Sequence, residues 1–233
     1  MQERIHPSLV RAYRRARYEV FLPSGAITFG IRQASRDIGH VMRDAACNTA
    51  ALLTACNPHS QVASDEENRK ANEALQSAVT AGGWRNVPTR ASAPDGQGPA
   101  EPGLLILGIA QHQADGLADS FGQHAYVWFG NLDALASLRI RGSLQVPKED
   151  ELQKWVQSLP AALQAETTKL KPIDLAWLMA VPDDELSHWL QPDTWDLNQP
   201  WPLAKPDGSE MGTGTELDRM FRIIAAGQVA MAM

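Results

Sequence analysis

The chain has few of the residues from which metal centres and disulfide frameworks are built. It contains only two cysteines, Cys47 and Cys56, and eight residues separate them. On an extended strand this spacing places the two sulfurs well beyond disulfide reach. The cysteines do not have the spacing of a zinc site, and the six histidines are scattered. We therefore expect buried free thiols, no metal site and no cofactor.

Familiar catalytic and membrane signals are also missing. The sequence has no Gly-x-Ser-x-Gly, no His-Glu-x-x-His and no glycine-rich phosphate loop. No apolar run approaches the ~20 residues that span a bilayer, and residues 1–17 lack the apolar stretch of a signal peptide. We expect a cytoplasmic protein that does not enter a membrane.

The charge does not favour nucleic acid as a partner. The formal net charge is -6, and the contents of hydrophobic (44%) and charged (21%) residues are typical of a globular protein. Residues 1–45 hold eight arginines against four acidic residues, a net of +4 that leaves -10 for the remainder. An arginine-rich helix can hold a phosphate or an acidic partner, but it more commonly forms a solvated face.

Hydrophobic periodicity predicts an α+β domain over residues 7–130. We expect helices over residues 7–17, 35–46, 64–81 and 110–122. We expect a hairpin over residues 18–31 and strands over residues 49–55, 84–90, 103–109 and 124–130. Alanines in the strand at 49–55 also permit a helix. The short helical crossover between the last two strands predicts a parallel pair, and hence a mixed β-sheet with flanking helices.

The pattern changes after Gly130. From Leu144 onward the apolar residues recur at helical spacing, which predicts a mainly α-helical C-terminal region over 131–233, packed on the first domain. Four of the seven tryptophans fall within a stretch of 25 residues in this region: Trp177, Trp189, Trp195 and Trp201. These tryptophans either cover the seam between the two regions or, through Trp195 and Trp201, bind a protein partner.

A polar cluster follows the strand expected at 49–55. Asn57, His59 and Ser60 lie in the loop at its carboxyl end, directly before a helix. Ligands of open α/β sheets bind at this end of the strands. On the next helix Asn68 falls on the inward face, where a buried amide needs partners. Alternatively, these side chains only brace the loop and cap the helix.

Three separated segments resemble a bacterial family catalogued as domain of unknown function 3293. The segments are LLTACNPHSQVASDEENRKANEAL, AEPGLLILGI and SFGQHAYVW. The positions that match the family pattern are Thr54, Asn57, Pro58, Ser60, Ser64, Glu67, Asn68, Glu101, Phe121, Gly122 and Gln123. Cys56 stands where the pattern has an aromatic residue, and Gly103 where it has serine. The resemblance covers about residues 7–130 and implies domain boundaries more than chemistry.

The matched positions predict a joint site. Glu101 and Gln123 each precede a strand, whereas Asn57 and Ser60 follow one. All four meet at one edge only if the strand at 49–55 runs antiparallel to the other two. Such side chains suit amides, nucleobase edges or ribose hydroxyls. The expected ligand-binding set is Asn57, His59, Ser60, Asn68, Glu101 and Gln123.

Three functions are compatible with these features. The working hypothesis is a non-catalytic module that binds a small polar ligand or a nucleotide at this edge. The first alternative is a hydrolase or transferase with Glu101 or His59 as acid or base. The second is a protein-interaction module that uses Trp195 and Trp201. No residue can be named as catalytic from the sequence.

Overall fold

The computed structural model describes residues 4–95, 99–159, 164, 167 and 171–180. The chain divides into two compact units, and we describe each by itself. One unit comprises residues 12–141, and the other comprises the described parts of 1–11 and 142–233. Trp189, Trp195 and Trp201, like all of residues 181–233 of the region expected to be helical, lie outside the described residues.

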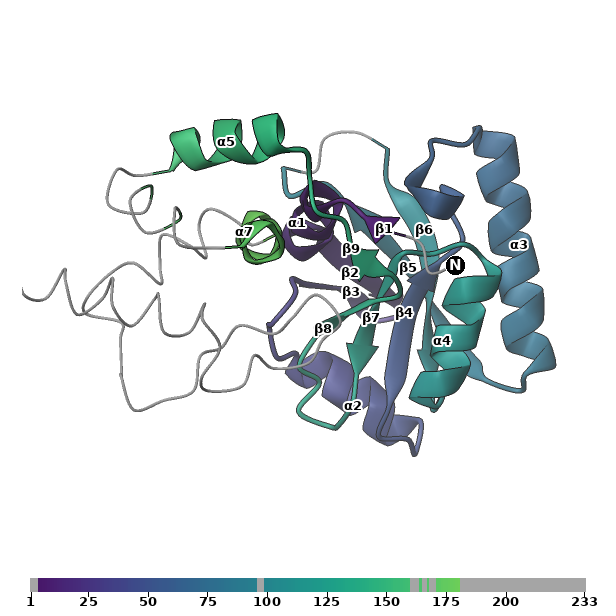
Figure 1. The fold of residues 1–233 in the computed structure, drawn as a ribbon. Helices are drawn as coiled ribbons and strands as arrows, with labels where there is room; N and C mark the ends of the chain where they lie inside the picture. Colours follow the sequence, from purple (N-terminus) through teal and green to yellow (C-terminus); the bar gives the residue numbers. More distant parts are fainter. Residues whose placement is uncertain (1–3, 96–98, 160–163, 165–166, 168–170, 181–233) are drawn as a thin grey trace, which may run out of the picture. The chain divides into compact units, whose positions relative to one another are not determined.

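A seven-stranded sheet forms the centre of the unit of residues 12–141 (Figure 1). Its strand order is β3-β2-β5-β6-β4-β7-β8, and each neighbouring pair is antiparallel. The strands are β2 (Arg17–Leu22), β3 (Gly25–Phe29), β4 (Ala50–Thr54), β5 (Arg85–Ser92), β6 (Glu101–Leu107), β7 (Ala125–Phe129) and β8 (Ser137–Ile140).

The prediction of a mixed sheet is wrong. β6 and β7 were expected to be a neighbouring parallel pair; they do point the same way, but β4 lies between them and runs antiparallel to both. Leu52 of β4 stands opposite Leu105 on one side and Val127 on the other. The first four residues of β4 are buried, which suits a central strand covered on both faces. β8 was not predicted, and it carries the sheet past Gly130.

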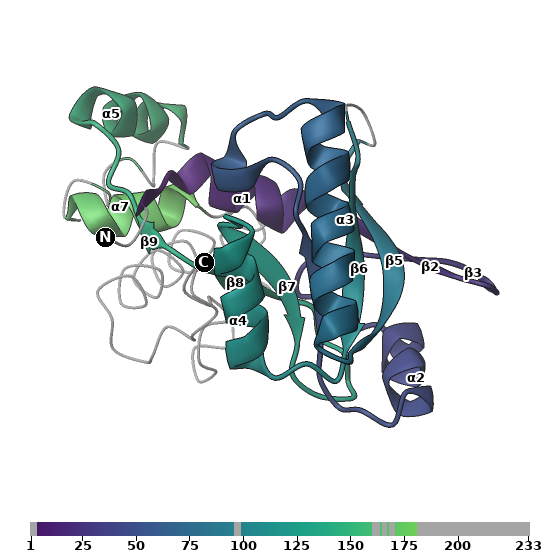
Figure 2. The same cartoon turned by 90° about the vertical axis from the view of Figure 1, so that its right-hand side faces the viewer.

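Helices cover both faces of this sheet. Figure 2 shows α3 (Asp65–Ala81) and α4 (Gln111–Ser120) along one face, with α2 (Arg36–Asp44) on the other side. The predicted capping box is present, because Ser64 accepts from Glu67 N and the Glu67 carboxylate accepts from Ser64 N. The α+β class is therefore confirmed for this unit.

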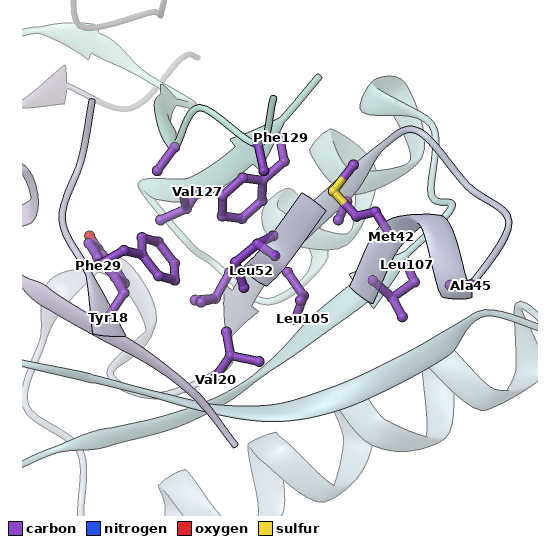
Figure 3. Close-up of a cluster of buried hydrophobic side chains, with 14 residues drawn as sticks. Tyr18, Val20, Phe29, Met42, Ala45, Leu52, Leu105, Leu107, Val127 and Phe129 are labelled. Atoms are coloured by element: carbon purple, nitrogen blue, oxygen red, sulfur yellow. The ribbon is translucent and has the colours of Figure 1, made fainter. Parts of the chain in front are cut away.

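Alternating residues of β4 serve two hydrophobic cores. Leu53 packs with Leu75 and Val79 of α3, whereas Leu52 faces the cluster drawn in Figure 3. In that cluster the rings of Phe29 and Phe129 meet edge to face, with centroids 5.5 Å apart. Each large side chain buried here contributes about 1.5–3 kcal/mol of transfer free energy. This packing fixes β4 and the loop that follows it.

In the residues that the structure describes, the other unit contains a small sheet, two helices and the first residues of a third helix, α1 (Pro7–Arg15). β1 (Arg4–Ile5) pairs in parallel with β9 (Ser143–Leu144), and α5 (Glu149–Ser158) and α7 (Pro172–Met179) follow along the chain. Two side chains near the N-terminus contact the later helices of this unit. His6 Nε2 lies 2.9 Å from Glu151 Oε1, and Arg11 Nε donates to Met179 O. The N-terminal residues thus share a unit with residues far along the chain. Among the residues that the structure describes, no helix is long and apolar enough to cross a membrane.

Candidate functional site

The loop between β4 and α3 has an unusual backbone. Asn57, His59 and Ser60 have φ values of +49°, +58° and +55°, in the left-handed region. This region is uncommon for residues other than glycine, and each such residue costs roughly 1–3 kcal/mol. Pro58–Ser60 form a short 3-10 turn, η1. Three left-handed residues within four positions require strong contacts from the surroundings to hold them.

Asn57 supplies the central contacts of this loop. Its Oδ1 accepts from Ala63 N at 3.0 Å and from Asn68 Nδ2 at 3.1 Å. Its Nδ2 donates to Glu101 Oε1 at 2.6 Å, and its backbone N–H donates to Asn68 Oδ1 at 2.8 Å. Both ends of the loop are therefore joined through one amide, which supports the bracing role for Asn57 and Asn68.

Two further amides hold the start of the loop. Asn72 Oδ1 accepts from Ala55 N at 3.1 Å, and Asn72 Nδ2 lies 2.9 Å from Cys56 Sγ. Gln123 Nε2 donates to Cys56 O at 2.9 Å. Burial raises the pKa of the Cys56 thiol, so this side chain stays protonated and unreactive at neutral pH. Both cysteines are free, as predicted; Cys56 is buried and Cys47 is half-buried.

Ser60 lies between a tyrosine and a histidine that the sequence did not single out as site residues. Its Oγ lies 2.5 Å from Tyr13 OH and 3.0 Å from His124 Nδ1. Tyr13 is half-buried at the end of α1 (Pro7–Arg15), and Tyr18 OH donates to its carbonyl at 2.8 Å. Burial is the main cause that raises the pKa of the Tyr13 phenol, so the phenol keeps its proton.

Local sequence patterns indicate other roles for Tyr13 and His124. Tyr13 has the spacing of the apolar stripe of its helix, which predicts packing rather than a polar contact. His124 counted as one of the scattered histidines, although it directly follows Gln123 in a segment of the family pattern. Its position next to Gln123 could have identified His124 as a candidate site residue.

His59 is exposed and sits over a glycine. Its backbone N–H donates to Gly122 O at 2.7 Å, and a Cβ built on Gly122 would lie 2.9 Å from His59 Nε2. Its ring centroid is 6.2 Å from that of the buried His124. His59 therefore lies near the Ser60 side of the loop. Among the described residues, no group of three His, Cys, Asp or Glu could hold a metal ion.

The structure brings the predicted residues to one edge of the sheet. β4 ends where β6 and β7 begin, because it runs antiparallel to both. Asn57 contacts Asn68 and Glu101 directly, whereas Gln123 reaches the loop through the Cys56 carbonyl. The condition on strand direction holds, and a ligand role for this edge stays a prediction.

Gly103 allows the close approach of two strands at this edge. It stands opposite Thr54 in β4 and Thr89 in β5. A Cβ built on it would lie 2.6 Å from Leu53 O, closer than real Cβ atoms come. A serine at this position would therefore force β4 and β6 apart in this chain.

Comparison with known proteins gives one match. No curated protein and no solved structure matches the chain. A family model described as "Protein of unknown function (DUF3293)" matches residues 53–126, a segment that runs from the end of β4 into β7. Asn57, Ser60, Asn68, Glu101 and Gln123 all fall within it. Over this segment, which is part of the chain, the predicted similarity to that family is confirmed.

Proposed function

We propose that this protein binds a small polar ligand, of the nucleoside or nucleotide kind, at the edge formed by Tyr13, Ser60 and Glu101. One observation carries the proposal: a strained loop is held by amides so that Ser60 and Glu101 lie at the same end of the sheet. Strained backbone of this kind clusters at ligand sites.

The hydrogen bonds divide the site into supporting and contacting groups. The side-chain amides of Asn57 and Asn68 form hydrogen bonds with each other, with the backbone of Ala63 and with Glu101. Gln123 Nε2 donates to the carbonyls of Cys56 and Phe121. These amides therefore shape the loop, and the ligand is contacted by Ser60, Tyr13 and Glu101.

The contacting groups favour a ligand rich in donors. A carboxylate accepts several hydrogen bonds, and the Asn57 amide occupies one of these positions on Glu101. Serine and tyrosine hydroxyls both donate and accept. Ribose hydroxyls and the amino edges of nucleobases match this set, whereas an anionic group beside Glu101 is disfavoured.

Thermal unfolding with a panel of nucleosides, nucleotides and polar metabolites tests the proposal. A ligand at 100 times its Kd stabilises the folded state by about 2.7 kcal/mol, which raises the midpoint by several degrees. Glu101→Gln should lose most of this shift, because glutamine can still accept from Asn57 but no longer carries the charge. Glu73→Gln, on the exposed face of α3, should keep it.

An equal shift in wild type and Glu101→Gln would place the ligand elsewhere and overturn the proposal. The acid–base alternative retains Glu101 and His59 as its candidates, and the same panel would identify its substrate. The interaction alternative depends on Trp195 and Trp201, which lie outside the described residues.

A further inference from the structure

The hydroxyl of Ser60 lies within hydrogen-bond distance of a tyrosine and a histidine. Its Oγ makes close contacts with two side chains, Tyr13 OH at 2.5 Å and His124 Nδ1 at 3.0 Å. A serine hydroxyl becomes a nucleophile when an adjacent base can take its proton. A hydrogen bond from serine to histidine is the geometric signature of such a pair.

The order of donors can be assigned from the chemistry of the three groups. Tyr13 keeps its proton and can donate to Ser60 Oγ. Ser60 can then donate to Nδ1 of His124, provided that the imidazole proton is on Nε2. In this order the serine proton points at the base, as general-base catalysis requires.

The backbone supports the same conclusion. Ser60 has φ +55° and is half-buried, so its backbone is strained and the residue is partly accessible to solvent. The nucleophilic serine of α/β-hydrolases likewise lies on a sharp, strained turn that exposes Oγ. The contacts of Asn57 and His59 hold this turn against α3 and against Gly122, in the turn between α4 and β7.

We propose that Ser60 is a nucleophile for acyl transfer, with His124 as general base and Tyr13 as a hydrogen-bond donor to the reacting oxygens. The proposal rests on the same edge as the proposed function and adds a reaction to it. It differs from the alternative in which Glu101 or His59 serves as acid or base, because Ser60, His124 and Tyr13 are in direct contact.

The step is a standard two-stage transfer. Ser60 Oγ forms a bond to the carbonyl carbon of an ester while its proton passes to His124 Nδ1. Collapse of the tetrahedral intermediate breaks the bond to the leaving alcohol, which takes that proton from His124. Water then attacks the acyl-serine with His124 as base, and release of the carboxylic acid restores the Ser60 hydroxyl. No oxidant, metal or cofactor takes part.

A fluorophosphonate ester tests the nucleophile in the full chain. Attack by Ser60 Oγ forms an O–P bond and expels fluoride, so the protein mass rises by one adduct. Peptide mapping should place the adduct on Ser60. His124→Asn should slow labelling by about 100-fold or more, and Tyr13→Phe by about 10-fold or more. Ser60→Ala should abolish the adduct, whereas Ser77→Ala on the exposed surface of α3 should label as wild type does.

Mapping the adduct in the wild-type protein does not depend on the folding of any variant. No adduct, or an adduct on another residue, overturns the nucleophile proposal. An equal labelling rate in wild type and a folded His124→Asn variant also overturns it. A ligand-induced thermal shift without labelling leaves ligand binding in place and removes only the reaction; absence of both removes both proposals.

Discussion

Asn57 donates from Nδ2 to Oε1 of Glu101 at 2.6 Å, joining residues that are 44 positions apart. The bond connects the loop after β4 with the first residue of β6. A hydrogen bond to a charged group contributes about 1.5–3 kcal/mol when it is shielded from water. This hydrogen bond joins the polar loop after β4 to Glu101, although the two are far apart along the chain.

Replacement of Asn57 tests the bracing role. Asn57→Ala should lower the free energy of unfolding by about 2–3 kcal/mol, because Ala63 N–H, Asn68 and Glu101 all lose a partner. Alanine is also strained at φ +49°. Urea unfolding monitored by circular dichroism gives the value. Asn131→Ala, in an exposed loop, is the matched control and should cost less than about 1 kcal/mol.

Asn57→Gly separates the side chain from the backbone. Glycine accepts a positive φ freely but cannot make any of the side-chain bonds. We expect Asn57→Gly to remain clearly less stable than wild type. Equal stability of the two proteins would show that the amide contacts contribute nothing.

Two glycine substitutions should have opposite effects. Gly103→Ala places a Cβ 2.6 Å from Leu53 O, so β4 and β6 must move apart at a cost of about 1–3 kcal/mol. Gly116→Ala, inside α4, meets nothing within 4 Å and should stabilise the protein by about 0.5–1 kcal/mol. Thermal unfolding of both variants checks the contrast, and a stable Gly103→Ala would contradict the close approach.

The capping box of α3 should make stability depend on acid pH. Hydrogen bonds from the Ser64 side chain and backbone lower the pKa of Glu67 in the folded state. Its contribution is therefore fully present above the unfolded-state pKa of about 4.3, and it is lost as pH falls through the folded-state value. Urea unfolding from pH 7 downward should show that the difference in free energy of unfolding between wild type and Glu67→Gln decreases as the pH falls. Ser64→Ala should remove the same pH-dependent component; an unchanged profile in both variants would contradict this role.

All three tyrosines should resist ionisation while the protein is folded. Burial raises the pKa of Tyr13 and of Tyr18, and burial together with the hydrogen bond to Asp115 raises that of Tyr126. Raised values in the folded state contribute stability below the unfolded-state pKa of about 10, and this stability is lost at higher pH. Tyrosinate absorbance should therefore appear together with alkaline unfolding. A tyrosine that titrates near pH 10 in the folded protein would show that it is not protected.

Local patterns in the sequence determined most elements of the described part of the chain. The hairpin, the capping box at Ser64 and Glu67, and the strands at β4, β5, β6 and β7 follow from side-chain period and from turn and cap chemistry. These signals act within a few residues, so they can be read without knowing the rest of the fold. The polar loop and its matched partners at Glu101 and Gln123 were located in the same way.

Tertiary structure alone decided which strands are neighbours and which side chains meet. β4 lies between β6 and β7 and runs antiparallel to both, so neighbouring strands are antiparallel. Its burial fits an interior position in the sheet, but only the tertiary structure decides which strands lie beside it. Periodicity reports which face of an element is buried and not what it packs against, so the contact of Ser60 with Tyr13 and His124 was not visible. The direction of β4 brought these groups together at one edge of the sheet.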